Sequence, residues 1–412
     1  MLSFPKILPF LLCGLPMVAA AQPSTLTDLE AALRAHPRLD ALSLRAGAQR
    51  DRGIAATALP DPEITLGLNN FPVFDPSFTE YLPTNKSIGL RQRLPNRGRL
   101  LADRDEATAR AAQLDAVRVS QFAELRADML VQLVTRKRVE DQLKLLDARL
   151  ERYAELDDVV LAEVDAGQPS LFRLAEIEGE RAEVERRSVA LQAEARRADA
   201  RLRELLGFVP DAVTISPELR VWPGNTRLFH AVRVAQEAVD IAKSRIEAAE
   251  SDFETDWALQ ATYHQRENGR NFDGDDWMSF GVTMTVPLWK TQKLKPRLRA
   301  AQADRSAALA DVQVAARNAL AQYEALDAER VAAREAARLI EGKIKTVEQA
   351  LADRLIVYES GTGGYAPIID GEIAVLALQS EIASEQAREV IAIVRMNGLH
   401  YSADTETAEV LP

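Results

Sequence analysis

Cysteine is almost absent from this chain, since Cys13 is the single one among 412 residues. It lies within residues 1–21, which predict a secretory signal peptide because Lys6 precedes an apolar run that ends in three alanines. Cleavage after Ala21 would leave a mature chain without cysteine. This excludes disulfides, thiolate nucleophiles and cysteine metal sites from the expected fold.

Long apolar runs are missing as well. No segment after the signal offers the roughly 18 consecutive apolar residues that a membrane-spanning helix needs, which excludes a helical membrane protein. A soluble periplasmic protein and an outer-membrane barrel both remain, because barrel strands give a much weaker sequence signal. The formal net charge is −11, and loss of Lys6 makes it one unit more negative. An acidic, exported chain argues against nucleic acid as a partner.

Residues that carry chemistry are scarce. Four histidines (His36, His230, His264 and His400) are far apart and lack the spacing of metal ligands. The segment 271–276 holds three aspartates but lacks the calcium-loop pattern. There is no phosphate-binding glycine loop and no G-x-S-x-G motif. We therefore expect no catalytic site, no metal site and no cofactor.

Most of the chain is rich in Ala, Leu, Glu and Arg and predicts long helices, separated by turns that contain Gly and Pro. The expected helices cover residues 26–57, 99–165, 170–206, 227–256, 291–360 and 366–397.

Four segments instead show the period of two that is typical of a strand with one apolar face. In the last of them, Phe280 and Val282 alternate with Gly281 and Thr283. Nine or ten residues per strand are enough to cross an outer membrane. The expected strands are 63–70, 86–94, 257–265 and 277–286. The side chains expected to face lipid are Ile64, Leu66, Leu68, Ile88, Leu90, Leu259, Tyr263, Phe280, Val282 and Met284.

The order of strands, long helix and short helix occurs twice. Nearly the same spacing separates Pro95 from Pro287, which close the second hairpin strands, and Gly167 from Gly361, which lie in the helical turns. This indicates an internal duplication. The expected organisation is a first repeat over 22–207, an equatorial linker over 208–226, a second repeat over 227–397 and a C-terminal tail over 398–412.

The short helices also match the long ones in combined length. We expect 170–206 to stack end to end with 227–256, and 366–397 with 26–57, so that both columns run beside the long helices. This arrangement predicts a cylinder of helices with a belt midway.

Four strands cannot close a barrel in lipid, because their edges would leave unpaired backbone groups. Three copies of the chain would supply 12 strands, a plausible pore. Trp257, Trp277 and Trp289 lie at the ends of the second hairpin and suit an interfacial aromatic girdle. The alternative is that both hairpins pack on a soluble core.

Three motifs in order along the chain resemble the TolC family of outer-membrane factors. They are Leu-Pro-Asn-Arg-Gly (94–98), Val-Pro-Leu-Trp (286–289) and Glu-Ser-Gly-Thr (359–362). The resemblance covers essentially the whole mature chain. The stretch over 59–73 is similar to the branch associated with heavy-metal and related cation efflux.

The resemblance implies a mainly α protein with a transmembrane β part: a homotrimer with one 12-stranded barrel in the outer membrane of a Gram-negative bacterium, continued by a periplasmic α-helical barrel. It implies a passive exit duct, not an enzyme, that docks to a periplasmic adaptor protein and an inner-membrane pump. The runner-up reading is a soluble periplasmic coiled-coil scaffold or adaptor-like interaction protein.

The family also suggests site residues. Asp370, with Glu372 nearby, falls where acidic side chains line the family's constriction, while Arg173 stands at a position expected to be acidic. Gly363 replaces an expected tip arginine, so any latch must differ. The turns expected to contact the adaptor comprise Gly167, Gln168, Pro169, Ser170, Gly361, Thr362, Gly363 and Gly364.

Overall fold

The structure is a computed structural model that describes residues 25–169, 171–211, 213 and 215–401. The signal peptide expected over 1–21, the tip residue Ser170 and positions 402–412 of the expected tail lie outside the described residues. Among the described helices, none combines the length and apolar character needed to cross a membrane.

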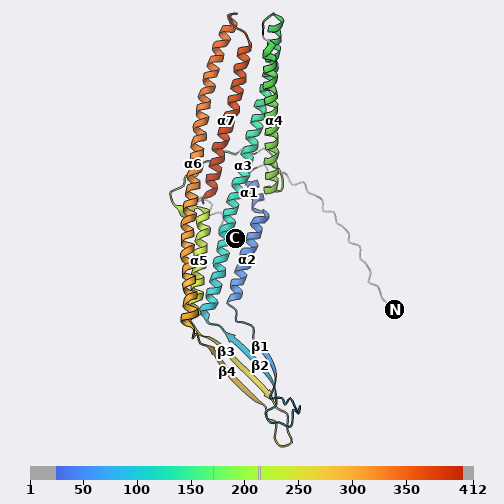
Figure 1. Ribbon diagram of the computed structural model, residues 1–412, viewed down its shortest axis with the longest axis vertical. Helices are drawn as coiled ribbons and strands as arrows, with labels where there is room; N and C mark the ends of the chain where they lie inside the picture. Colours follow the sequence, from blue (N-terminus) through green and yellow to red (C-terminus); the bar gives the residue numbers. More distant parts are fainter. Residues whose placement is uncertain (1–24, 170, 212, 214, 402–412) are drawn as a thin grey trace, which may run out of the picture.

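The chain forms an elongated wall of helices that ends in one four-stranded sheet (Figure 1). With 69 residues, α3 is roughly 100 Å long. The elements are α1 (Leu26–Arg34), α2 (Pro37–Ala56), β1 (Glu63–Asn69), β2 (Asn85–Leu94), α3 (Arg97–Asp165), α4 (Leu171–Leu206), the 3₁₀ turn η1 (Thr226–Leu228), α5 (His230–Ser251), β3 (Asp256–Gln265), β4 (Trp277–Thr285), the π-helical turn η2 (Lys290–Leu294), α6 (Lys295–Glu359) and α7 (Ala366–Leu399).

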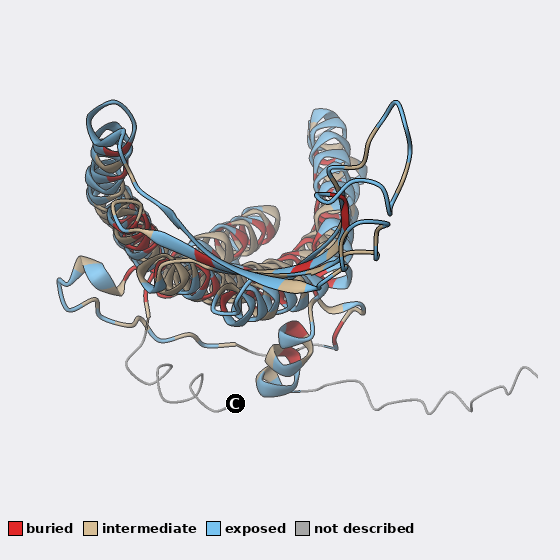
Figure 2. Cartoon of the chain, turned by 90° about the horizontal axis from the view of Figure 1, so that it is seen from below, coloured by how far each residue is buried: buried red, intermediate tan, exposed pale blue. Residues whose placement is uncertain are grey.

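Two long helices, α3 and α6, run the full height of the wall (Figure 1). Near the sheet α3 packs against α2 and α5, and beyond the midpoint it packs against α4 and α7. The other long helix, α6, contacts α5 and α7. Seen from below, helices and sheet follow one curve, so the wall has a concave and a convex side (Figure 2).

The seam between α3 and α4 has the spacing of a coiled coil. The buried positions Val139, Leu146, Tyr153 and Val160 of α3 recur every seven residues. The same interval separates Ile177, Val184, Leu191 and Ala198 of α4. A strict seven-residue apolar repeat keeps one narrow face of each helix against its neighbour and supercoils the pair.

Two expected helices are corrected by the structure. The helix expected over 26–57 is broken into α1 and α2, because Pro37 lacks an N–H and starts a new helix for which His36 is the N-cap. The helix expected over 227–256 is shorter at both ends. Phe229 is extended and pairs with His400, and α5 ends at Ser251.

The predicted pairing of the short helices is wrong. In this chain α4 descends toward α1, which it contacts, so α4 continues the column of α2. The end of α7 meets the start of α5 through the Phe229–His400 bridge. The helices α4 and α7 thus pack on the long helices α3 and α6, to which short turns connect them, and the combined lengths fit either pairing.

One buried polar side chain links the two halves. Gln142 of α3 is fully buried, and its amide nitrogen donates to the carbonyl oxygen of Ser380 (2.9 Å) and to Oγ of Ser384 (2.7 Å) on α7. Its amide oxygen accepts from Arg138 at 2.9 Å. The two bonds to α7 are made together only when α3 and α7 keep one axial register.

The joint between α7 and α5 buries two histidines. His230 is 7% exposed, and its ring lies 4.1 Å from the ring of Tyr401, centroid to centroid. His400 is 3% exposed, and its Nδ1 lies 3.0 Å from the carbonyl oxygen of Tyr401. Burial lowers the pKa of His230 to about 4, with smaller contributions from His400 and Arg233.

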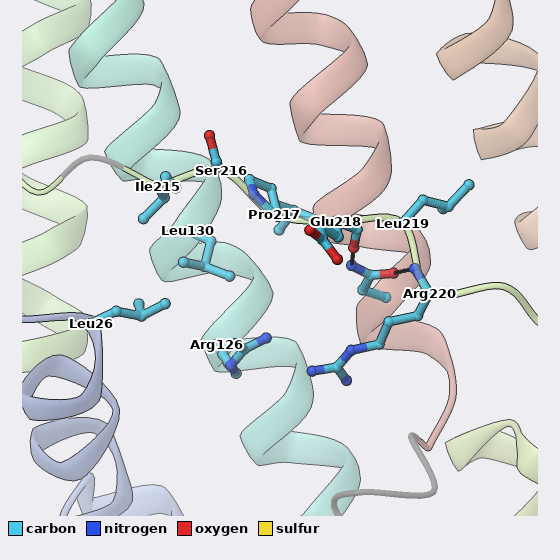
Figure 3. Close-up of a pocket in the computed structure, with 11 residues that line it drawn as sticks. Leu26, Arg126, Leu130, Ile215, Ser216, Pro217, Glu218, Leu219 and Arg220 are labelled. Carbon is cyan, nitrogen blue, oxygen red and sulfur yellow. Dashed lines mark hydrogen bonds between the residues drawn. The ribbon is translucent and has the colours of Figure 1, made fainter.

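The connection from α4 to α5 crosses α3 and α7 at the same height (Figure 3). Asn397 of α7 holds it, accepting from the backbone N–H of Arg220 (2.9 Å) and donating to the carbonyl of Glu218 (2.8 Å). Between this connection and the helices lies an open cavity of about 580 Å³. A belt therefore lies across the middle of the wall.

Candidate functional site

The four strands pair in chain order, β1-β2-β3-β4, and every neighbouring pair is antiparallel. Directly opposite residues point to the same side of a sheet. Leu66 lies opposite Ile88, Ile88 opposite Tyr263, and Tyr263 opposite Met278. The register therefore places all ten side chains that were expected to face lipid on one face of the sheet.

This apolar face is uncovered. Its ten expected members are all exposed, from 40% for Tyr263 to 78% for Phe280. On the opposite face, Gly89 is buried and Ala258 is only 6% exposed. Side chains crowd together on the inside of a curved sheet, so we infer that the polar face is the concave one.

Trp277 does not join the exposed apolar face, contrary to the expected aromatic girdle. It lies opposite His264 on the polar face, and the two rings are stacked with their centroids 5.0 Å apart. The guanidinium of Arg266 lies 4.5 Å from the Trp277 ring centroid. Trp257 and Trp289 are 47% and 68% exposed. Only these two tryptophans are exposed near the helical end of the sheet.

The outer strands β1 and β4 each have one side without a partner among the described residues. An open strand edge presents unpaired backbone N–H and C=O groups. The sheet is thus a segment that a further strand can extend at either side.

Both helical turns lie at the end of the wall far from the sheet (Figure 1). Gly167 and Gly361 adopt φ values of +86° and +72°, which favour glycine, and neither has a neighbouring atom close to the site of a Cβ. Gly363 and Gly364 have no such positive φ, so only the first glycine of each turn is required by its backbone conformation.

Each expected constriction carboxylate is paired within its own chain. Arg173 of α4 lies 2.5 Å from Asp370 of α7 and 3.1 Å from Glu176. Arg152 of α3 lies 3.5 Å from Glu372. The expectation placed Asp370, Glu372 and Arg173 at the constriction without pairing them, whereas the structure brings the guanidinium of Arg173 against Asp370.

An apolar pair beside the first turn was not among the predicted site residues. Leu171 and Phe172 are 68% and 67% exposed at the start of α4. Their signal was visible in the sequence, because two large apolar residues directly follow a turn that was expected to contact a partner protein.

No protein-family model matches this sequence, and no curated protein matches it significantly. Solved structures do match. CusC, described for conformational changes in folding and transmembrane channel formation, has a TM-score of 0.75 at 15% identity, covering 91% of this chain and 92% of that chain.

Two further structures are similar over most of their length. The outer membrane protein VceC of Vibrio cholerae has a TM-score of 0.70 at 17% identity, over 91% of this chain and 96% of its own. The MtrE outer membrane channel of Neisseria gonorrhoeae, in its open state, has a TM-score of 0.74 at 17% identity, over 91% and 88%. This chain therefore has the fold of the outer-membrane channels, and the resemblance to the TolC family is confirmed at the level of the fold.

Proposed function

We propose that three copies of this chain form an outer-membrane channel, the passive exit duct of a tripartite efflux system that works with a periplasmic adaptor and an inner-membrane pump. The observation that carries the proposal is the sheet. It has one exposed apolar face, one polar face and two open edges, at the end of a wall about 100 Å long.

The strand order supports closure by copies. Since neighbouring strands alternate in direction, β1 and β4 run antiparallel to each other. The β4 edge of one copy can therefore pair with the β1 edge of the next without breaking the alternation. Three copies would close 12 strands and leave no edge in lipid.

The rival function is a soluble periplasmic scaffold whose hairpins bind another protein. In a soluble scaffold, protein rather than lipid would have to cover the apolar face of the sheet. Nothing in the described part of the chain covers that face, which favours the channel. The membership in a heavy-metal or cation branch stays a prediction from residues 59–73.

The architecture is tested by the mass of the mature protein in detergent after inner and outer membranes are separated. We expect a trimer in the outer-membrane fraction, because open strand edges are costly in lipid. A monomer in the soluble periplasmic fraction would instead support the scaffold.

We further propose that the tips dock the adaptor and that Asp370, with Arg173 and Glu372, controls the constriction. In a trimer, three Asp370 side chains would come with three Arg173 partners. Both side chains are partly exposed, so each pair is weak, about 0–1 kcal/mol. A weak pair suits a closed end that must open.

Single-channel recording tests this assignment. Asp370→Ala should raise conductance or lower cation preference, because it removes three carboxylates and leaves each Arg173 with Glu176 as its remaining acidic partner. Arg173→Ala should instead raise cation preference. Glu381→Ala, which removes an exposed charge from the same helix, serves as the control. If Asp370→Ala has the conductance and cation preference of wild type, the assignment of Asp370 to the constriction is wrong.

A further inference from the structure

A basic segment follows the last strand directly. After Val286 and Pro287 come Leu288 and Trp289, which are 74% and 68% exposed, and then η2 and the first turns of α6. The five cations of these turns are all exposed: Lys290, Lys293, Lys295, Arg297 and Arg299.

Little acidic charge balances these cations. No Asp or Glu occurs between residues 286 and 299. Arg297 lies 3.4 Å from Asp252, whereas the other four cations make no ion pair with an acid in the described part of the chain. At the equivalent place in the first repeat, Arg99 and Arg104 pair with Asp103 and Asp105. The unbalanced charge is thus specific to the second repeat.

The cations do not stabilise the helix on which they lie. Positive side chains in the first turn of a helix oppose its dipole. Neither η2 nor α6 has an acidic residue in its first turn or a side-chain cap. The segment itself therefore supplies no negative charge to balance these cations.

We propose that residues 288–299 bind anionic phospholipid headgroups on the periplasmic side of the outer membrane, an inference that rests on the proposed function. The apolar face of β4 would contact the acyl chains of the lipids. Leu288 and Trp289 would then lie at the membrane–water interface, where Trp and Tyr side chains are enriched. The lysines that follow would then lie at headgroup height. Basic residues beside a membrane surface attract anionic lipids.

Lipid selectivity tests the proposal. The mature trimer is reconstituted in phosphatidylcholine vesicles with spin-labelled phosphatidylglycerol or phosphatidylcholine, and electron paramagnetic resonance measures the motionally restricted fraction of each. At low salt we expect wild type to prefer phosphatidylglycerol by about two-fold or more, with the preference falling as salt is added.

The double variant Lys290→Gln/Lys293→Gln should lose this preference. Its control is Lys343→Gln/Lys345→Gln, which removes two exposed lysines from the far half of the same helix and should keep it. The lipid site is contradicted if the wild type shows no preference for phosphatidylglycerol, or if the double variant shows the same preference as the wild type. Neither result would contradict the proposed channel. If neither lipid shows a motionally restricted fraction, the protein does not contact the bilayer. That result would contradict the proposed channel and the lipid site together.

Discussion

Val282→Arg should abolish stable assembly of the channel in the outer membrane. Val282 lies near the middle of β4 on the exposed apolar face and is 66% exposed. An arginine facing lipid near the midplane costs about 2–4 kcal/mol per subunit, and a trimer carries this cost three times. The measurement is the amount of trimer in the outer-membrane fraction.

Thr283→Arg is the matched control. Thr283 is the next residue on the same strand, is exposed, and lies opposite Ala258 on the polar face. Its arginine would face water in the lumen, so trimer yield should stay near that of wild type. Equal loss, or equal tolerance, of the two variants would contradict the assignment of the two faces.

Acid should weaken the joint between α7 and α5. His230 has a folded pKa of about 4, against 6.5 when unfolded, because burial disfavours its charged form. Between these values the unfolded chain binds a proton that the folded chain does not, so stability falls as pH falls through this window. From pH 7 to pH 5 the loss is about 2 kcal/mol per chain.

The measurement is urea unfolding followed by helical circular dichroism at pH 7 and pH 5. Carboxylates contribute to the same change, so wild type is compared with His230→Phe, whose ring can fill the site without titrating. We expect the variant to lose about 2 kcal/mol less than wild type between the two pH values. An identical loss in both proteins would show that His230 is not the group responsible.

The strands and long helices were predictable because their patterns are local. The alternation around Phe280 defines both faces of β4, and glycine marks each helical turn. The same alternation places Trp277 on the polar side, one residue before Met278, so the expected girdle overlooked a pattern already present. The break at Pro37 was also visible, because a proline within a helical pattern commonly starts a new helix.

Other features depend on which helices become neighbours. The pair of Arg173 and Asp370 joins residues from the two repeats that are 197 positions apart in the sequence. Combined helix lengths did not distinguish the two pairings. Likewise, nothing adjacent to Gln142 in sequence indicates that its partners lie on α7.

The hydrogen bonds of Gln142 fix the height of α7 relative to α3, and with it the relative height of the two helical turns far from the sheet. If α7 slid along α3 by two helical turns, both Ser380 and Ser384 would move away from the buried amide of Gln142, at a cost of about 1–3 kcal/mol. The two helical hairpins therefore cannot shift in height independently. In the proposed trimer their turns would present one level rim, on which the proposed ring of adaptor subunits could rest evenly.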